Sequence, residues 1–183
     1  MSLIDVDGMK KLLGLPPAPI FSLLSEDPGV CTVPENDTLG AVTQLMLRSL
    51  TGQIAAYLEF CEFMDGKVTI LPSRFGGFGE GLLNVSRVKT GRVTLARLTS
   101  SGDRYAMHVA TGNAVTPRKW EECGWAQPAP MLPSLEVVLD SPVEAFAQRV
   151  MSQHYFIVYS DATAEIAALC GLLGIEVLRE AAV

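Results

Sequence analysis

A change between apolar and polar side chains at every second residue constrains the fold of this chain more than any other feature. The segment 91–98 alternates in this way, and the segment 104–110 alternates again after a Ser/Gly/Asp turn. Successive side chains of a β-strand point to opposite faces, so this period of two predicts two strands joined as a hairpin. Val93 and Leu95 are expected on one face of the sheet, together with Arg97.

Further strands are expected on both sides of this hairpin. A long apolar, β-prone run at 54–64 precedes Asp65-Gly66, which is typical of a hairpin turn, and a returning strand at 67–71. Residues 135–139 form another such run. Several short strands separated by Gly and Asp turns predict a small antiparallel barrel or sandwich.

Helical patterns flank the strands. An apolar series at helical spacing predicts a helix from Asp37 or Thr38 to Leu50, closed by Gly52. Ser141-Pro142-Val143-Glu144 has the form of a capping box and predicts a helix to about Met151. A final βαβ unit is expected, made of a strand at 154–159, a helix at 162–173 and a strand at 175–178.

A change of character near Gln53 divides the chain into two parts. Residues 1–52 offer one short strand, at 30–33, and one long helix, which is too little for a complete α/β domain. We interpret them as the truncated end of an α/β middle domain, in a fragment whose first residues resemble an expression leader. Residues 53–183 are interpreted as a β-barrel domain with appended helices, so the expected fold class is α+β.

Charge and composition exclude several partners. The net charge is −6 and Lys and Arg form no cluster, whereas binding to nucleic acid or to an anionic membrane surface requires a basic patch. No apolar run reaches the roughly 18 residues that span a bilayer. The four cysteines form no CxxC pair and are expected as free thiols in a reducing compartment. The sequence therefore predicts a cytoplasmic protein with no nucleic-acid or membrane partner.

Asp37 and His154 are the candidate metal ligands. Asp37 stands at the start of a predicted helix in the segment Glu35-Asn36-Asp37-Thr38, where it could equally be an ordinary N-cap. His154 begins a predicted strand just after a turn, where side chains often project into a site, although a structural role is the alternative. The only other histidine, His108, lies in mid-strand and is expected to be structural or on the surface.

Two further residues are candidates for substrate contact. Trp125 lies in a Pro-rich loop, where its indole could stack on a sugar or cover an end of the barrel. Glu59 and Glu62 interrupt an apolar strand, and their spacing of three places them on opposite faces. The Gly-rich run at 75–81 lacks the pattern of a phosphate-binding loop and is expected to be an ordinary loop.

Five segments, taken in order, carry a resemblance to a known family: Glu35–Gly40, Leu50–Glu59, Gly91–Leu98, Trp125–Pro128 and Gln153–Asp161. Together they resemble the C-terminal part of the L-fucose isomerase and L-arabinose isomerase family of metal-dependent aldose–ketose isomerases. The resemblance implies a six-stranded Greek-key barrel after the tail of an α/β domain, a homo-oligomer and a small sugar as substrate. In this chain Glu59 stands where the family has an aspartate.

The resemblance also implies a mechanism. Asp37 and His154 would bind a divalent cation, typically Mn2+, while carboxylates move a proton along a cis-enediol route. Glu35 could assist Asp37. The family has a second carboxylate upstream, but no Asp or Glu occurs between Gly8 and Ser25. The isolated chain is therefore expected to be inactive, and the alternative is a non-catalytic barrel that binds carbohydrate or holds subunits together.

Overall fold

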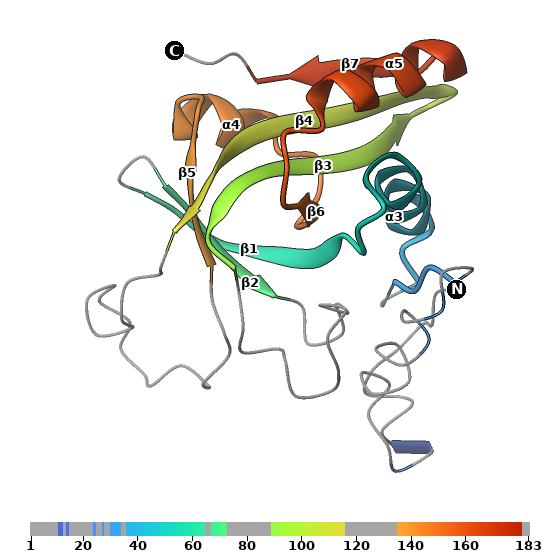
Figure 1. Ribbon diagram of the computed structural model, residues 1–183, viewed down its shortest axis with the longest axis horizontal. Helices are drawn as coiled ribbons and strands as arrows, with labels where there is room; N and C mark the ends of the chain where they lie inside the picture. The colour runs from blue at the N-terminus through green and yellow to red at the C-terminus, as the bar shows by residue number, and fades with distance from the viewer. Residues whose placement is uncertain are drawn as a thin grey trace.

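The computed structural model describes residues 11–12, 14, 24, 27, 30–33, 36–64, 67–72, 89–115 and 135–180. This part of the chain has a mixed α+β fold, in which a strongly curved sheet is flanked by helices (Figure 1). None of the helices described is long and apolar enough to cross a membrane.

The sheet has seven strands in the order β3-β6-β1-β2-β5-β4-β7, and β3 also pairs with β4. Each strand from β1 to β6 therefore has two antiparallel neighbours. β7 is parallel to β4 and has no second neighbour among the described strands. The strands are β1 (Ala56–Met64), β2 (Lys67–Pro72), β3 (Gly91–Ser101), β4 (Arg104–Val115), β5 (Leu135–Leu139), β6 (His154–Val158) and β7 (Glu176–Arg179).

In the described part of the chain three helices cover the sheet: α3 (Thr38–Thr51), α4 (Val143–Arg149) and α5 (Thr163–Leu173). α3 packs against β3 and β6, α4 packs against β1, and α5 packs against β7 and β4. Gly52 ends α3 and Gly174 ends α5, both with a φ of 68° that favours glycine. α4 thus lies on one face of the curved sheet, and α3 and α5 lie on the other face.

Two apolar clusters lie on opposite sides of the strands. In β1, Ala56 and Leu58 face the inner cluster, which includes Phe146 of α4. Tyr57 faces the outer cluster, which joins the sheet to α3 and α5 through Leu47 and other buried residues. This separation follows from the period of two, because neighbouring residues of one strand lie on opposite faces.

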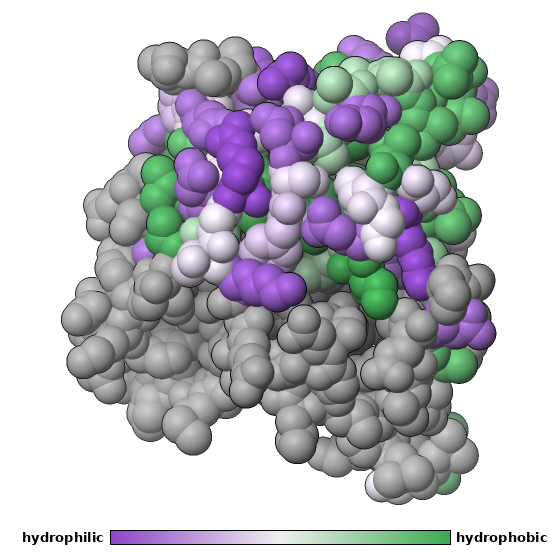
Figure 2. Space-filling model, in the orientation of Figure 1, coloured by the Kyte–Doolittle hydropathy of each residue, from purple (hydrophilic) through white to green (hydrophobic). Residues whose placement is uncertain are grey.

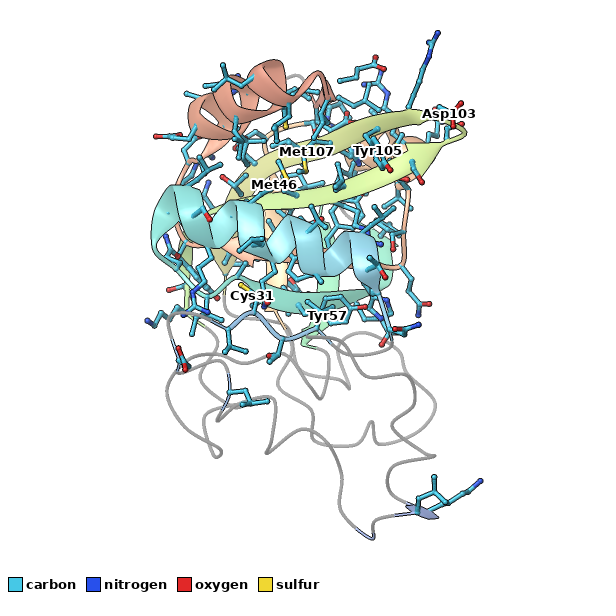
Figure 3. All side chains as sticks on the ribbon, turned by 90° about the vertical axis from the view of Figure 1, so that its right-hand side faces the viewer. Cys31, Met46, Tyr57, Asp103, Tyr105 and Met107 are labelled. Atoms are coloured by element: carbon cyan, nitrogen blue, oxygen red, sulfur yellow. The ribbon has the colours of Figure 1, made fainter. Side chains whose placement is uncertain are left out.

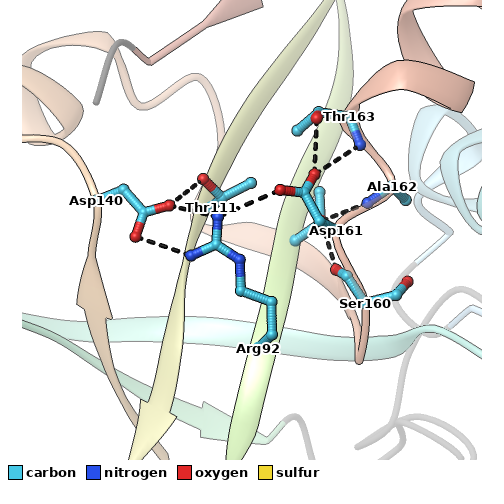
Figure 4. A network of polar contacts seen from close by, with 8 residues as sticks. Arg92, Thr111, Asp140, Ser160, Asp161, Ala162 and Thr163 are labelled. Carbon is cyan, nitrogen blue, oxygen red and sulfur yellow. Dashed lines mark hydrogen bonds and ion pairs between the residues drawn. The ribbon is translucent and has the colours of Figure 1, made fainter.

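A polar network joins β3 to the ends of β5 and β6 (Figure 4). Arg92 lies 2.6 Å from a carboxylate oxygen of Asp140 and 3.3 Å from one of Asp161. Asp161 in turn accepts hydrogen bonds from the backbone and hydroxyl of Thr163, at 3.2 and 2.7 Å. These contacts fix the turn between β6 and α5 on the outside of β3.

The structure confirms most of the predicted elements and corrects three details. Residues 30–33 form no strand, and only Val33 makes an isolated bridge. The capping box does not form: Pro142 is the N-cap of α4, and the Ser141 hydroxyl has no hydrogen-bond partner among the described residues. β6 and β7 are not sheet neighbours, because β3 and β4 lie between them. The division of the chain at residue 52 stays a prediction.

Candidate functional site

Tyr57 contacts both of the expected metal ligands, Asp37 and His154, at one corner of the molecule. It lies on β1 beneath the first turn of α3 (Figure 3). Its hydroxyl donates to Oδ2 of Asp37 at 3.3 Å. Its ring stacks on the imidazole of His154, with the ring centroids 4.7 Å apart and the planes inclined by 18°. Asp37 and His154, which are far apart in the sequence, therefore contact the same side chain.

Asp37 is held by contacts on both carboxylate oxygens. Asn36, with a φ of 55°, turns the chain into α3, and Asp37 then caps the helix by accepting from the backbone of Gly40 at 2.8 Å. Arg97 of β3 forms a fork on the same carboxylate, with Nη2 at 2.8 Å from Oδ1 and Nη1 on Oδ2. The side chains of Arg97 and Asp37 are only 9% and 14% exposed.

The charge of Asp37 is stabilised by these contacts. Burial would raise the pKa of its carboxyl, but the hydrogen bonds from Arg97, Gly40 and Tyr57, with the charge of Arg97, hold the pKa below 3.8. Asp37 is thus ionised at neutral pH and paired with a buried guanidinium. An ion pair of this kind depends on both partners, since removal of one leaves the other buried and unpaired.

Gly40 leaves the space that this ion pair occupies. A Cβ atom at this position would lie 2.3 Å from Oδ2 of Asp37 and 3.0 Å from Nη1 of Arg97. Only glycine therefore permits the fork of Arg97 to lie against the first turn of α3.

Glu59 lies beside His154 at the same corner. The two residues are direct partners in the antiparallel pairing of β1 with β6, and both are half-buried. Residues paired in this way have side chains on the same face of the sheet, within reach of each other. The exposed amide of Gln153 donates to Oε1 of Glu59. A carboxylate, an amide and an imidazole thus lie side by side at the molecular surface.

The structure therefore brings together three of the five residues expected at a site: Asp37, His154 and Glu59. Glu35 and Trp125 lie outside the described residues. Arg97 and Tyr57 belong to the corner but were not predicted as site residues. Arg97 did carry a signal, because the alternation placed its charge on the same face as Val93 and Leu95, and a buried charge requires a partner.

A Mn2+ centre needs several ligand side chains grouped around one point. Among the residues that the structure describes, no three His, Cys, Asp or Glu side chains are grouped so that they could hold a metal ion. Both oxygens of Asp37 already accept hydrogen bonds, and a guanidinium occupies the position next to them. As they stand, these residues do not fit Mn2+, whose ligands must offer free lone pairs.

His108 is the cross-strand partner of Arg97 and is fully buried between β4 and α4, where its ring stacks on that of Phe146 with the centroids 5.2 Å apart. Its mid-strand position is thus a core position.

No model of a known protein family matches the chain. No curated protein matches its sequence.

Proposed function

We propose that this chain is a non-catalytic, carbohydrate-binding domain of the L-fucose and L-arabinose isomerase type. The observation that supports it is the convergence of Asp37, His154 and Glu59 around Tyr57. These are three of the residues that the family resemblance assigns to the site.

The proposed fold is a closed, six-stranded Greek-key barrel. The pairing of β3 with both β4 and β6 supports this proposal, because it gives each strand from β1 to β6 two neighbours. The corner then lies on the outer wall of the barrel, where α3 begins.

In the proposed complex, the sugar binds to Glu59, Gln153 and His154. A carboxylate accepts hydrogen bonds from sugar hydroxyls, an amide both donates and accepts, and an imidazole can do either. The buried pair of Asp37 and Arg97 holds α3 in place beside them. Glu35 and Trp125 are proposed to add further contacts.

The domain is proposed to be non-catalytic because Asp37, the expected catalytic carboxylate that the structure describes, is not free to transfer a proton. An aldose–ketose isomerisation needs a carboxylate that can take up and release a proton. Asp37 has a lowered pKa and is paired with Arg97. A metal-dependent isomerase remains the second candidate, favoured by the proximity of Asp37 and His154; it would require Arg97 to leave the carboxylate.

A homo-oligomer is also proposed. On α5, Leu172 is 85% exposed and Leu173 is 58% exposed, and on α3 Leu45 is 56% exposed. Hydrophobic residues gather at the upper right of the molecule in Figure 2, the position of the end of α5 in Figure 1. A helix with an apolar outer face is typical of a buried helix, and a second subunit could cover it.

Sugar binding is tested by thermal unfolding in the presence of L-fucose, L-arabinose and the corresponding ketoses. A ligand that binds only the folded state raises its stability by RT ln(1 + [L]/Kd), so the midpoint should rise with sugar concentration. Glu59→Gln and His154→Ala should lose this rise. Glu165→Gln, an exposed acid on α5, should keep it and serves as the control.

Two results would contradict the proposal. One is a wild-type midpoint that does not depend on any of the sugars. The other is a rise with Mn2+ in the wild type that both Asp37→Ala and His154→Ala abolish, which would identify the metal-dependent isomerase instead.

A further inference from the structure

A buried chain of hydrogen bonds links β4, β6 and the residue after β7. Nδ1 of His108 lies 2.5 Å from the hydroxyl of Tyr155, and Nε2 lies 2.8 Å from Oε1 of Glu180. His108 and Tyr155 are fully buried, and Glu180 is 6% exposed. Two ionisable side chains, His108 and Glu180, thus contact each other in the core.

The direction of each hydrogen bond follows from the backbone of Met151. Its N–H donates to the hydroxyl oxygen of Tyr155 at 3.2 Å, so the Tyr155 O–H is directed at Nδ1 of His108. Nδ1 is then an acceptor, and the proton of the neutral ring is on Nε2, where it is donated to Glu180. Each hydrogen bond in this network therefore has both a donor and an acceptor only while His108 is neutral.

Glu180 connects β7 to this hydrogen-bond network. β7 has only four residues and is bonded to β4 alone among the described strands. The backbone of Glu180 donates to the carbonyl of Val109 at 3.0 Å, and its carboxylate lies under β4 on His108. β7 is therefore attached by a short parallel pairing, by the packing of Val177 against the outer cluster and by the contact between Glu180 and His108.

Among the residues that the structure describes, the charged groups around His108 come from three other parts of the chain. Glu180 lies at the end of β7, Arg149 of α4 lies 3.6 Å from the same oxygen of Glu180, and Arg97 of β3 is the cross-strand partner of His108. Burial lowers the pKa of His108 below its ordinary 6.5, and Glu180 opposes this effect only in part. Protonation would also turn Nδ1 into a donor, so that the Tyr155 O–H would lose its acceptor.

We propose that the contact between His108 and Glu180 is an acid-sensitive latch that holds β7 against β4. In acid, His108 takes up a proton, the chain of hydrogen bonds breaks, and β7 separates from the edge of β4. One proton controls the opening, so the ratio of open to closed molecules rises by at most about tenfold for each pH unit below about 6.5.

The test is hydrogen exchange of the β7 amides at about pH 7.5 and about pH 5, corrected for the intrinsic exchange rates. In the wild type, protection of β7 should be lower in the acid sample, by at most about thirtyfold. His108→Gln keeps a neutral donor for Glu180 without a titrating ring, so its protection should be the same at both pH values. The chain has only two histidines, and His154→Gln is the control that should behave like the wild type.

The latch is excluded if wild-type protection does not change with pH, or if His108→Gln retains the change. It is also excluded if His154→Gln loses the change. Should His108→Gln fail to fold, NMR of the wild type decides: the His108 ring and the Glu180 amide must titrate with one midpoint, and separate midpoints would overturn the proposal.

Discussion

At the scale of single residues, Asp37 combines a helix cap with a buried ion pair. The cap could be predicted, because Asp before an apolar helical series is a local pattern. The partners could not, because Tyr57 and Arg97 reach Asp37 only through the pairing of distant strands. Likewise, the start of β6 at His154 was predicted, but not the aromatic ring on which the imidazole lies.

Gly40→Ala should destabilise the protein, although alanine normally favours a helix. The new Cβ would lie 2.3 Å from the Asp37 carboxylate and would displace the fork of Arg97. We expect a loss of about 2–3 kcal/mol, typical of overpacking at a closely packed position, and a midpoint of thermal unfolding lower by roughly 4–12 °C.

The matched control is Gly171→Ala in α5, where a Cβ meets no atom within 4 Å. This variant should be as stable as the wild type, or more stable by up to about 1 kcal/mol. Equal midpoints of thermal unfolding for Gly40→Ala and Gly171→Ala would show that the Asp37–Arg97 ion pair does not require glycine at position 40.

At the scale of elements, the sequence predicted strands and helices well where the pattern was long. The alternation at 91–98 became β3, and the run at 135–139 is β5 without a change of bounds. The capping box failed for a local reason: with Pro142 as the N-cap, Ser141 lies one residue too early to reach the amides of the first turn. The expected strand at 30–33 is reduced to a single bridge at Val33.

Thr94→Val should loosen the junction between β6 and α5. The buried hydroxyl of Thr94 donates to the carbonyl of Ser160 at 2.7 Å and accepts from the amide of Ala162 at 3.0 Å. Valine has the same shape but leaves both backbone groups without a partner, so we expect a loss of about 2–4 kcal/mol in urea unfolding.

Thr94→Ser is the comparison, because serine keeps the hydroxyl and removes only a methyl group. It should retain most of the stability, losing about 1 kcal/mol. If serine and valine cost the same, the hydroxyl does not hold the turn that Figure 4 shows beside Arg92.

At the scale of the whole molecule, the order of the strands could not be predicted. Local patterns identify β3 and β4 as a hairpin, but nothing in them places β6 between β3 and β1 or β7 beside β4. Long-range pairing depends on the complementary surfaces of complete elements, such as the apolar clusters on the two sides of β1. The class α+β therefore followed from the sequence, whereas the neighbours of each strand did not.

The stability of the whole molecule in acid should depend on Asp37. Its pKa in the folded state is below 3.8, so the unfolded chain binds more protons in that range. The contribution of Asp37 to the free energy of unfolding is thus fully present above pH 3.8 and is lost as the pH falls through the lower pKa that Asp37 has in the folded state. Asp37→Asn should be less stable than the wild type near pH 6, and the two should converge as the pH falls through the lowered pKa of Asp37.

The measurement is the midpoint of urea unfolding of both proteins across this range. Subtracting the two profiles removes the contributions of His108, Asp140 and Asp161, which both proteins retain. Profiles that run parallel down to the lowest pH would mean that the charge of Asp37 contributes nothing to folding.

The position of β6 has a consequence for how the chain is made. β6 lies between β3 and β1 in space but follows all the other antiparallel strands in the sequence. A ribosome therefore completes β1 to β5 while the edges of β1 and β3 still lack the strand that will pair with both. Unpaired edges of this kind join to those of other chains. Until β6 has been made and has paired, newly synthesised molecules therefore present these unpaired edges to other chains.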